Sequence, residues 1–410
     1  GSAYTFTYTT VGEIVAWVIG WDLILEMLMA GSVVSKYWGV YLNQFFELIG
    51  WNINTNIAIG SFNFDLAPVI IVAFFTALLV MGTKIGARVD GALTILKIAI
   101  VVFIVVVGFF YIKAENFTPF IPPSEPAAST DGSGVSAVME QPLWQWATGM
   151  APSIYGVTGI ISGAALVFFA FLGFDVVATA SEETINPKKN VPLGIGVGLG
   201  LIIVLYTLVA IVTTGMVSYK DLAKQSDPSL AVAFKMVGAD WAAKIISLGI
   251  VIGMATVVMV LLLGLTRVVF AMSRDGLLPR GLSHTGKHGT PVRLQIIVGV
   301  VMALIAACCN VGILSDMVNI GTLSAFTLVA ISIPIMRKKR PDLERSFKIP
   351  GNPWVPILIA IANLWLMVNL SVLTWIRFVV WLIVGFAIYF GYGYRHARLG
   401  AGELEVAAQE

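Results

Sequence analysis

The chain has 410 residues, of which 58% are hydrophobic and 12% are charged, and its mean hydropathy is +0.90. Soluble domains carry about 25% charged residues, so this composition excludes an ordinary soluble protein and predicts an integral membrane protein. The 25 basic and 23 acidic side chains leave a net charge of only +2. Nucleic acid is therefore excluded as a partner, because such binding depends on a strong positive field.

Ten apolar stretches follow one another along the chain, and we expect each to form a membrane-spanning helix. A helix needs about 20 apolar residues to cross the hydrocarbon. The 40 glycines, 11 tryptophans and 23 phenylalanines fit lipid-embedded helices better than the short alternating strands of a barrel. The predicted fold is all-α, with spans near residues 13–35, 66–83, 91–112, 158–181, 192–217, 243–272, 292–309, 315–336, 354–372 and 376–394.

Basic residues are unevenly distributed between the predicted spans. When alternate loops are assigned to opposite sides, sixteen Lys and Arg residues fall on one side and seven on the other. The more basic side of a membrane protein is cytoplasmic, so we expect both termini inside. The longest loop then lies outside, and we interpret Trp144 and Trp146 within it as interfacial anchors, with a ligand cage as the alternative.

Five charged residues lie within the predicted spans: Asp22, Glu26, Lys97, Asp175 and Arg267. A charge at such depth costs about 2.5–3.5 kcal/mol on insertion scales, so each marks a candidate functional site. At about 1.5 Å per residue, Lys97, Asp175 and Arg267 all lie about 8–9 Å from the cytoplasmic end of their spans. Asp22, at about 13 Å, is a better partner for Lys97 than Glu26, at about 20 Å. Snorkelling of the long side chains to the inner surface is the alternative for Lys97 and Arg267.

The fourth predicted span contains a run of aromatic residues, Phe168–Phe174, interrupted by Gly173. A glycine permits a spanning helix to unwind, and the freed backbone dipoles could then bind a small zwitterion. Close helix packing at Gly173 is the alternative. The glycines between residues 194 and 200 indicate packing of small residues rather than a phosphate loop, since they lie inside a span.

The sequence contains no pattern expected of an enzyme, a metal centre or a bound cofactor. His284, His288 and His396 all lie outside the predicted spans, and Cys308 and Cys309 are adjacent in an apolar run with no histidine at metal-ligand spacing. We expect reduced cysteines, no metal and no cofactor.

Several short motifs, each occurring once, follow one another along nearly the whole chain. Through these motifs the chain resembles bacterial members of the cationic amino acid transporter branch of the amino acid–polyamine–organocation superfamily. The motifs are Gly1–Thr5 with Gly12-Glu13, Gly20–Glu26, Leu93–Lys97, Phe117–Phe120, Phe171–Asp175, Ser181–Glu183, Asn186-Pro187 and Ala271–Pro279.

The resemblance implies a LeuT-like fold of twelve helices, in which five plus five are related by an inverted repeat. The ten spans would be family helices three to twelve, so the first two family helices are expected to be absent from this chain. The expected parts are residues 1–112 (helices three to five), 113–157 (extracellular loop), 158–336 (second repeat, helices six to ten), 337–353 (cytoplasmic basic loop), 354–394 (two C-terminal helices) and 395–410 (cytoplasmic tail).

The resemblance also implies a proton-coupled symporter of L-amino acids that works by alternating access in the plasma membrane. An exchanger without proton coupling and a non-transporting scaffold or subunit are the alternatives. Partners would be an L-amino acid, a proton and membrane lipid, with a sterol or a single-span subunit as further candidates.

Site residues follow from the same resemblance. Lys97 would carry the coupling proton, because a desolvated lysine can exchange a proton near neutrality, with Glu26 as the alternative carrier. Phe169 would close over the substrate, with Phe171 next in line, at a break spanning Ala170–Gly173.

Four apolar side chains would face the pocket: Ile24, Met27, Val258 and Leu261. Since none of them is acidic, a small or medium neutral amino acid fits better than arginine. Asp175, Arg267 and Asp22 would form an inner gate network.

Overall fold

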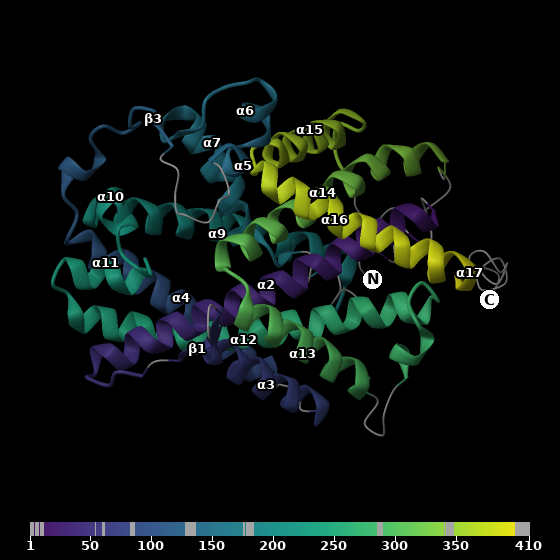
Figure 1. Cartoon of the computed structure of the whole chain (residues 1–410), viewed down its shortest axis with the longest axis horizontal. Coiled ribbons are helices and arrows are strands. Elements are labelled where there is room, and N and C mark those ends of the chain that lie inside the picture. Colours follow the sequence, from purple (N-terminus) through teal and green to yellow (C-terminus); the bar gives the residue numbers. More distant parts are fainter. Residues whose placement is uncertain are drawn as a thin grey trace.

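The computed structural model describes residues 4, 8, 12–53, 55–59, 62–82, 87–127, 137–174, 177, 184–284, 290–339, 341 and 348–397. Asp175 and residues 398–410 of the predicted tail lie outside these ranges. The described chain is mostly helical (Figure 1). Its long helices are α2 (Glu13–Leu48), α3 (Leu66–Val80), α4 (Ala87–Phe109), α7 (Gly156–Val167), α9 (Pro187–Met216), α12 (Asp240–Arg274), α13 (Val292–Cys308), α14 (Val311–Lys339), α15 (Trp354–Val368) and α16 (Val372–Ile388).

Short elements connect these helices. Strands β1 (Asn56–Ile59) and β2 (Phe62–Asp65) form an antiparallel hairpin, and β3 (Glu125–Pro126) pairs with β4 (Ser153–Ile154). The short helical segments are η1 (Ala114–Phe117), α5 (Ala137–Glu140), α6 (Leu143–Ala147), η2 (Phe168–Phe171), α10 (Tyr219–Ala223), α11 (Leu230–Met236), η4 (Arg280–Ser283), η5 (Tyr389–Gly393) and α17 (Tyr394–His396).

Helix α2 runs diagonally through the middle of the molecule, and its most extensive contacts are with α12 and α14 (Figure 1). Glycines allow this close approach. A Cβ added to Gly20 would lie 2.7 Å from the sulfur of Met272 on α12, and one added to Gly264 would lie 2.9 Å from the sulfur of Met27 on α2. A larger residue at either point would have to displace the facing methionine side chain.

The Glu13 end of α2 is fastened to the C-terminal helices. The ring of Trp21 stacks on Trp17 at 5.6 Å and on Trp381 of α16 at 4.4 Å between ring centres. The Trp21 indole N–H also donates to the carbonyl of Trp381 at 2.9 Å. Beyond α16, the Tyr389 hydroxyl donates to Glu13 at 2.8 Å. The two ends of the described chain therefore pack together.

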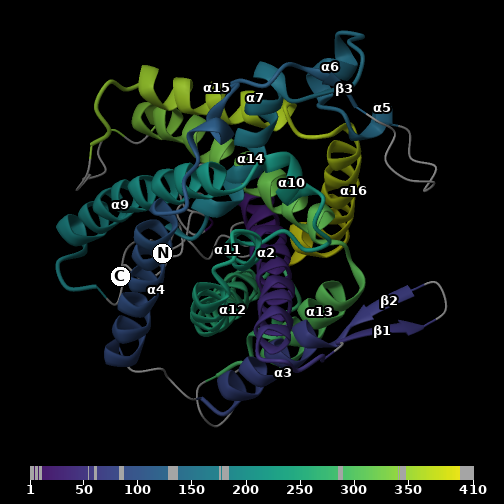
Figure 2. The same ribbon diagram turned by 90° about the vertical axis from the view of Figure 1, so that its left-hand side faces the viewer.

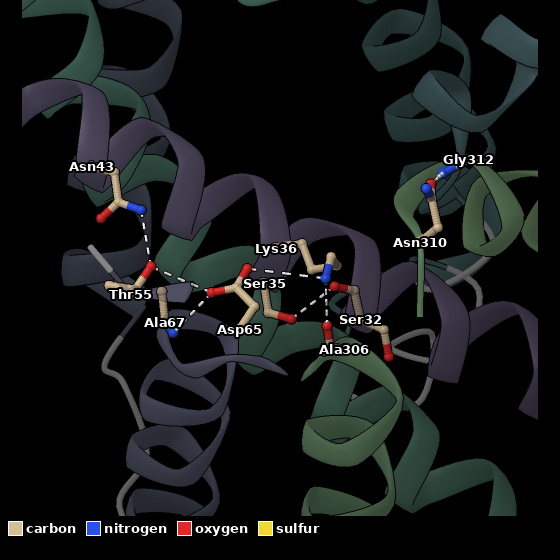
Figure 3. A network of polar contacts seen from close by, with 10 residues as sticks. All are labelled: Ser32, Ser35, Lys36, Asn43, Thr55, Asp65, Ala67, Ala306, Asn310 and Gly312. Atoms are coloured by element: carbon tan, nitrogen blue, oxygen red, sulfur yellow. Dashed lines mark hydrogen bonds and ion pairs between the residues drawn. The ribbon is translucent and has the colours of Figure 1, made fainter. Parts of the chain in front are cut away.

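Towards its Leu48 end, α2 carries a network of polar contacts (Figure 3). The Lys36 ammonium donates to the carbonyl of Ala306, in the last turn of α13, at 2.9 Å. It also lies 4.0 Å from a carboxylate oxygen of Asp65, and both side chains are 15% exposed. Asp65 in turn accepts from the backbone N–H of Ala67 at 3.2 Å, and so caps α3. Lys36 thus ties α2 to both α13 and α3.

Opposing effects act on the pKa of the Asp65 carboxyl. Burial raises this pKa above its ordinary value, whereas the Lys36 ammonium and the hydrogen bonds from Ala67 and Thr55 act in the opposite direction. These three partners therefore stabilise the ionised form of the Asp65 carboxyl against the cost of its burial.

The structure agrees with the predicted helices and differs in their extent. Each of the ten predicted stretches contains a helix among the described residues. Six of these helices are long and apolar enough to cross a membrane, and four are shorter: α3, α7 with η2, α13 and α15. Helix α2 is longer than the first predicted span, 13–35, because it continues to Leu48 with Tyr41 buried and with Gly39 packed against Ala67.

We expect Lys36→Met to lower the free energy of unfolding by about 1–3 kcal/mol, because the Ala306 carbonyl loses its charged donor and the Asp65 carboxylate loses its cation partner. The measurement is thermal or denaturant unfolding of purified protein in detergent. Without Lys36 the pKa of Asp65 should rise further, so the ionised carboxylate should cost more at neutral pH. The destabilisation should therefore shrink as the pH falls through the raised pKa of Asp65.

Lys235→Met is the matched control. Lys235 contacts Glu47 at 2.8 Å, but the two side chains are 49% and 57% exposed, and such surface pairs contribute about 0–1 kcal/mol. Equal losses for Lys36→Met and Lys235→Met would show that the network in Figure 3 contributes no more than a surface contact.

Candidate functional site

The helix that begins with α7 is interrupted where the sequence places Gly173. Regular α-helix ends at Val167, and one tight turn, η2, follows to Phe171. Leu172 is then extended, with φ −67° and ψ 153°. Gly173 has φ +110°, a backbone conformation that residues with a side chain rarely adopt. The chain is therefore non-helical at the predicted position.

Two side chains from neighbouring helices donate to carbonyls at the interruption. The Tyr206 hydroxyl of α9 donates to the carbonyl of Ala170 at 2.8 Å, and the Asn319 amide of α14 donates to the carbonyl of Leu166 at 3.0 Å. In a continuous helix the Ala170 carbonyl would accept the backbone N–H four residues on. Here the phenol replaces that donor.

Aromatic rings enclose the same segment. Phe326 of α14 contacts Phe168 at 6.3 Å and Phe174 at 5.2 Å between ring centres, so it touches the chain on both sides of the interruption. On the α9 side, Tyr206 meets Phe171 edge-on at 5.3 Å. The interruption therefore lies between α9 and α14, which both contact it through these side chains.

A cavity of about 560 Å³ follows α7 towards the interruption. It reaches from Tyr155, beside the start of α7, to Leu166 near its end, and Asp316 of α14 lines its wall. Asp316 accepts a hydrogen bond from the hydroxyl of Thr374 at 3.0 Å. This space, whose wall includes the Asp316 carboxyl, reaches Leu166, the residue whose carbonyl accepts from Asn319.

Lys97 lies where α4 packs on α12. A Cβ added to Gly253 of α12 would lie 3.2 Å from Cγ of Lys97, and one added to Gly249 would meet Ile100 one turn further along α4. Lys97 is half-buried at this contact. Its aliphatic part is therefore held against a glycine face of α12.

The predicted partnership of Lys97 with Asp22 is not a hydrogen bond in this structure. Asp22 is fully buried on α2, and within the described part of the chain neither carboxylate oxygen forms a hydrogen bond with Lys97. Glu26, one turn along α2, is 3% exposed. Of the predicted inner network, Arg267 lies on the exposed side of α12, and Asp175 lies outside the described residues.

The predicted pocket residues lie in two different environments. Ile24, Met27 and Val258 are buried in the apolar core between α2 and α12, and Leu261 is half-buried near Gly31. The members at the interruption are more open: Phe169, Phe171 and Gly173 are half-buried, and Ala170 is exposed. The structure thus separates the predicted pocket into a core group and a group at the break.

Three residues that the sequence analysis did not single out surround the interruption: Tyr206, Asn319 and Phe326. Asn319 could have been found, because an amide within an apolar span is costly unless it is hydrogen-bonded. Tyr206 carries a weaker signal, since tyrosine is common near membrane interfaces. Phe326 has none.

The described residues include no group of three or more His, Cys, Asp and Glu side chains that could hold a metal ion. Cys308 and Cys309 are not joined in a disulfide. What the site offers chemically is hydrogen bonding by backbone and side-chain groups, which suits binding rather than bond breaking.

Comparison with known proteins places these features in a family. The model of the amino acid permease family matches residues 1–391. The chain is 40% identical to the branched-chain amino acid permease BcaP of Bacillus subtilis, and the match covers 97% of this chain and 80% of that protein. It is 39% identical to the methylthioribose transporter of the same organism, with the same coverage. Identity to human cationic amino acid transporter 4 is 27%, over 98% of this chain and 78% of the relative. The chain belongs to the amino acid permease family, and it is a multi-pass membrane transporter rather than an enzyme.

Proposed function

We propose that the protein is a proton-coupled symporter for L-amino acids with small or medium neutral side chains. The observation that carries the proposal is the interrupted helix at residues 168–173, with its carbonyls held by α9 and α14. Backbone groups at a break inside the membrane can bind the charged groups of a zwitterion, and alternating access can then move it across.

The choice of a neutral substrate rests on the side chains at the break and on the relatives. The rings of Phe168, Phe169 and Phe171 are apolar, and a guanidinium would need a carboxylate partner. One relative transports branched-chain amino acids by its name. The methylthioribose transporter is almost as similar, so the thiosugar is the second candidate substrate.

Proton coupling is assigned to Lys97. This half-buried lysine packs on Gly253 of α12 and lies in the apolar segment Gly91–Phe109 of α4. A lysine held there can take up and release a proton, which arginine cannot do. Glu26 is the alternative carrier. Asp22, Arg267 and Asp175 are proposed to close the inner route.

The arrangement in the membrane follows the charge distribution. We place the protein in the plasma membrane with both termini in the cytoplasm, because most loop Lys and Arg residues then lie inside. Helices α7 to α14 would form the second inverted repeat.

The function is tested by uptake into proteoliposomes containing the full-length protein under an imposed pH gradient, acidic outside. We expect saturable accumulation of L-leucine, L-isoleucine or L-valine that a protonophore abolishes. L-arginine and methylthioribose should compete weakly. Accumulation of methylthioribose in place of any amino acid would favour the second candidate, and uptake indifferent to the gradient would favour an exchanger.

Lys97→Ala should abolish pH-driven accumulation while exchange of labelled for unlabelled amino acid persists, because only the coupling step needs the titrating group. Lys244→Ala is the control, since Lys244 lies exposed near the start of the same partner helix, α12. Wild-type accumulation by Lys97→Ala would exclude Lys97 as the proton carrier and would favour Glu26.

Phe169→Ala should weaken substrate binding by about 2 kcal/mol if the ring closes over the substrate, as buried aromatic truncations do. Isothermal titration or the apparent KM for uptake measures this. Phe110→Ala removes a ring that is 80% exposed and should leave affinity unchanged. Unaltered substrate affinity in Phe169→Ala would show that this ring does not close over the substrate and would favour Phe171 as the gate.

A further inference from the structure

Helix α9 touches the interruption through one side chain in two ways. The Tyr206 hydroxyl donates to the Ala170 carbonyl at 2.8 Å, and the ring of Tyr206 packs edge-on against Phe171 at 5.3 Å. Other hydroxyls of α9 behave differently. Thr207 and Thr214 donate to carbonyls of their own helix, Ile203 at 2.8 Å and Ala210 at 2.7 Å. Tyr206 is therefore directed outward to the interrupted chain.

The two donors at the interruption belong to different parts of the molecule. Asn319 lies on α14, which packs extensively on the central helix α2. Helix α9 makes its extensive contacts, within the described residues, with α4, η1 and α11. The carbonyls of Leu166 and Ala170, about one helical turn apart, are thus held from two sides by helices that do not share the same core.

The Tyr206 hydrogen bond replaces one that the helix has lost. The chain turns away from the helix axis at Leu172, and among the described residues the Ala170 carbonyl accepts from the Tyr206 hydroxyl instead of from a helical N–H. A carbonyl left unpaired in an apolar surrounding is costly, so the phenol stabilises this conformation relative to one in which the carbonyl turns elsewhere. The direction of the Ala170 carbonyl then depends on where α9 lies.

We propose that Tyr206 is a positioning residue for transport, which fixes the backbone of the interruption from α9 without contacting the substrate. This proposal rests on the proposed function in one respect, namely that the interruption is the substrate site. Movement of α9 would be transmitted to the site through this side chain.

The test compares three variants of the full-length protein. Tyr206→Phe removes only the hydroxyl and keeps the ring against Phe171. Phe171→Leu removes the ring contact and keeps the hydroxyl bond. Thr207→Val is the matched control, because it removes the neighbouring hydroxyl, which bonds only within α9.

Tyr206→Phe should raise the apparent KM for L-leucine by about three- to tenfold, the range expected for one lost hydrogen bond, with the maximal rate less affected. Hydrogen–deuterium exchange should quicken at residues 168–174 and stay unchanged in α2 and α12. Thr207→Val should match wild type in both measurements.

Two results would overturn the proposal: wild-type KM and wild-type exchange at residues 168–174 in Tyr206→Phe, or a general loss of thermal stability with KM unchanged. Failure of the proposed function has a different signature. Suppose that the wild type transports no amino acid, but Tyr206→Phe still quickens hydrogen–deuterium exchange only at residues 168–174. The positioning role of Tyr206 would then be supported, and the assignment of an amino acid substrate would be wrong.

Discussion

The enclosure of α2 by its neighbours is the constraint on which the rest of the architecture depends. Asp22 and Glu26 lie one turn apart in an apolar helix, and carboxyl groups at that depth are costly in contact with lipid. Both side chains are buried, α12 and α14 are the helices that pack most extensively on α2, and glycines such as Gly20 and Gly264 permit the approach of α12. Because α2 occupies the centre, the helices carrying the candidate site are arranged around it.

The proposed coupling group and the interruption lie on elements that are linked by packing. Helix α4 carries Lys97, packs on α12 and contacts α9, and α9 carries Tyr206, which binds Ala170. A contiguous series of contacts therefore joins Lys97 to the interruption without passing through α2. Coupling between two sites needs such a physical connection or a shared change of state.

The sequence predicted the helices well, because each is a long apolar run, and it predicted the interruption because a glycine lies in a run of aromatic residues. It did not predict how far α2 continues, since polar residues such as Lys36 and Glu47 interrupt the apolar pattern of residues 36–48 and the partners of this segment, such as Ala67 and Ala306, lie elsewhere in the chain. The roles of Tyr206 and Asn319 depend on contacts between distant segments. Met27 and Val258 were expected to face the pocket, but they are buried in the core between α2 and α12. The position of a residue along a helix does not show which neighbouring helix packs against it.

The length of α2 has a consequence for how the molecule meets the aqueous phase. Its 36 residues extend about 54 Å, whereas the hydrocarbon layer is about 30 Å thick. Even a tilt of about 40°, at the upper end of the observed range, leaves roughly 10 Å of helix outside the hydrocarbon. The polar side chains Asn43, Gln44 and Glu47 mark the Leu48 end as the part that emerges. The β1–β2 hairpin lies beside this end (Figure 2), so we expect the two together to be accessible to antibody fragments raised against the folded transporter.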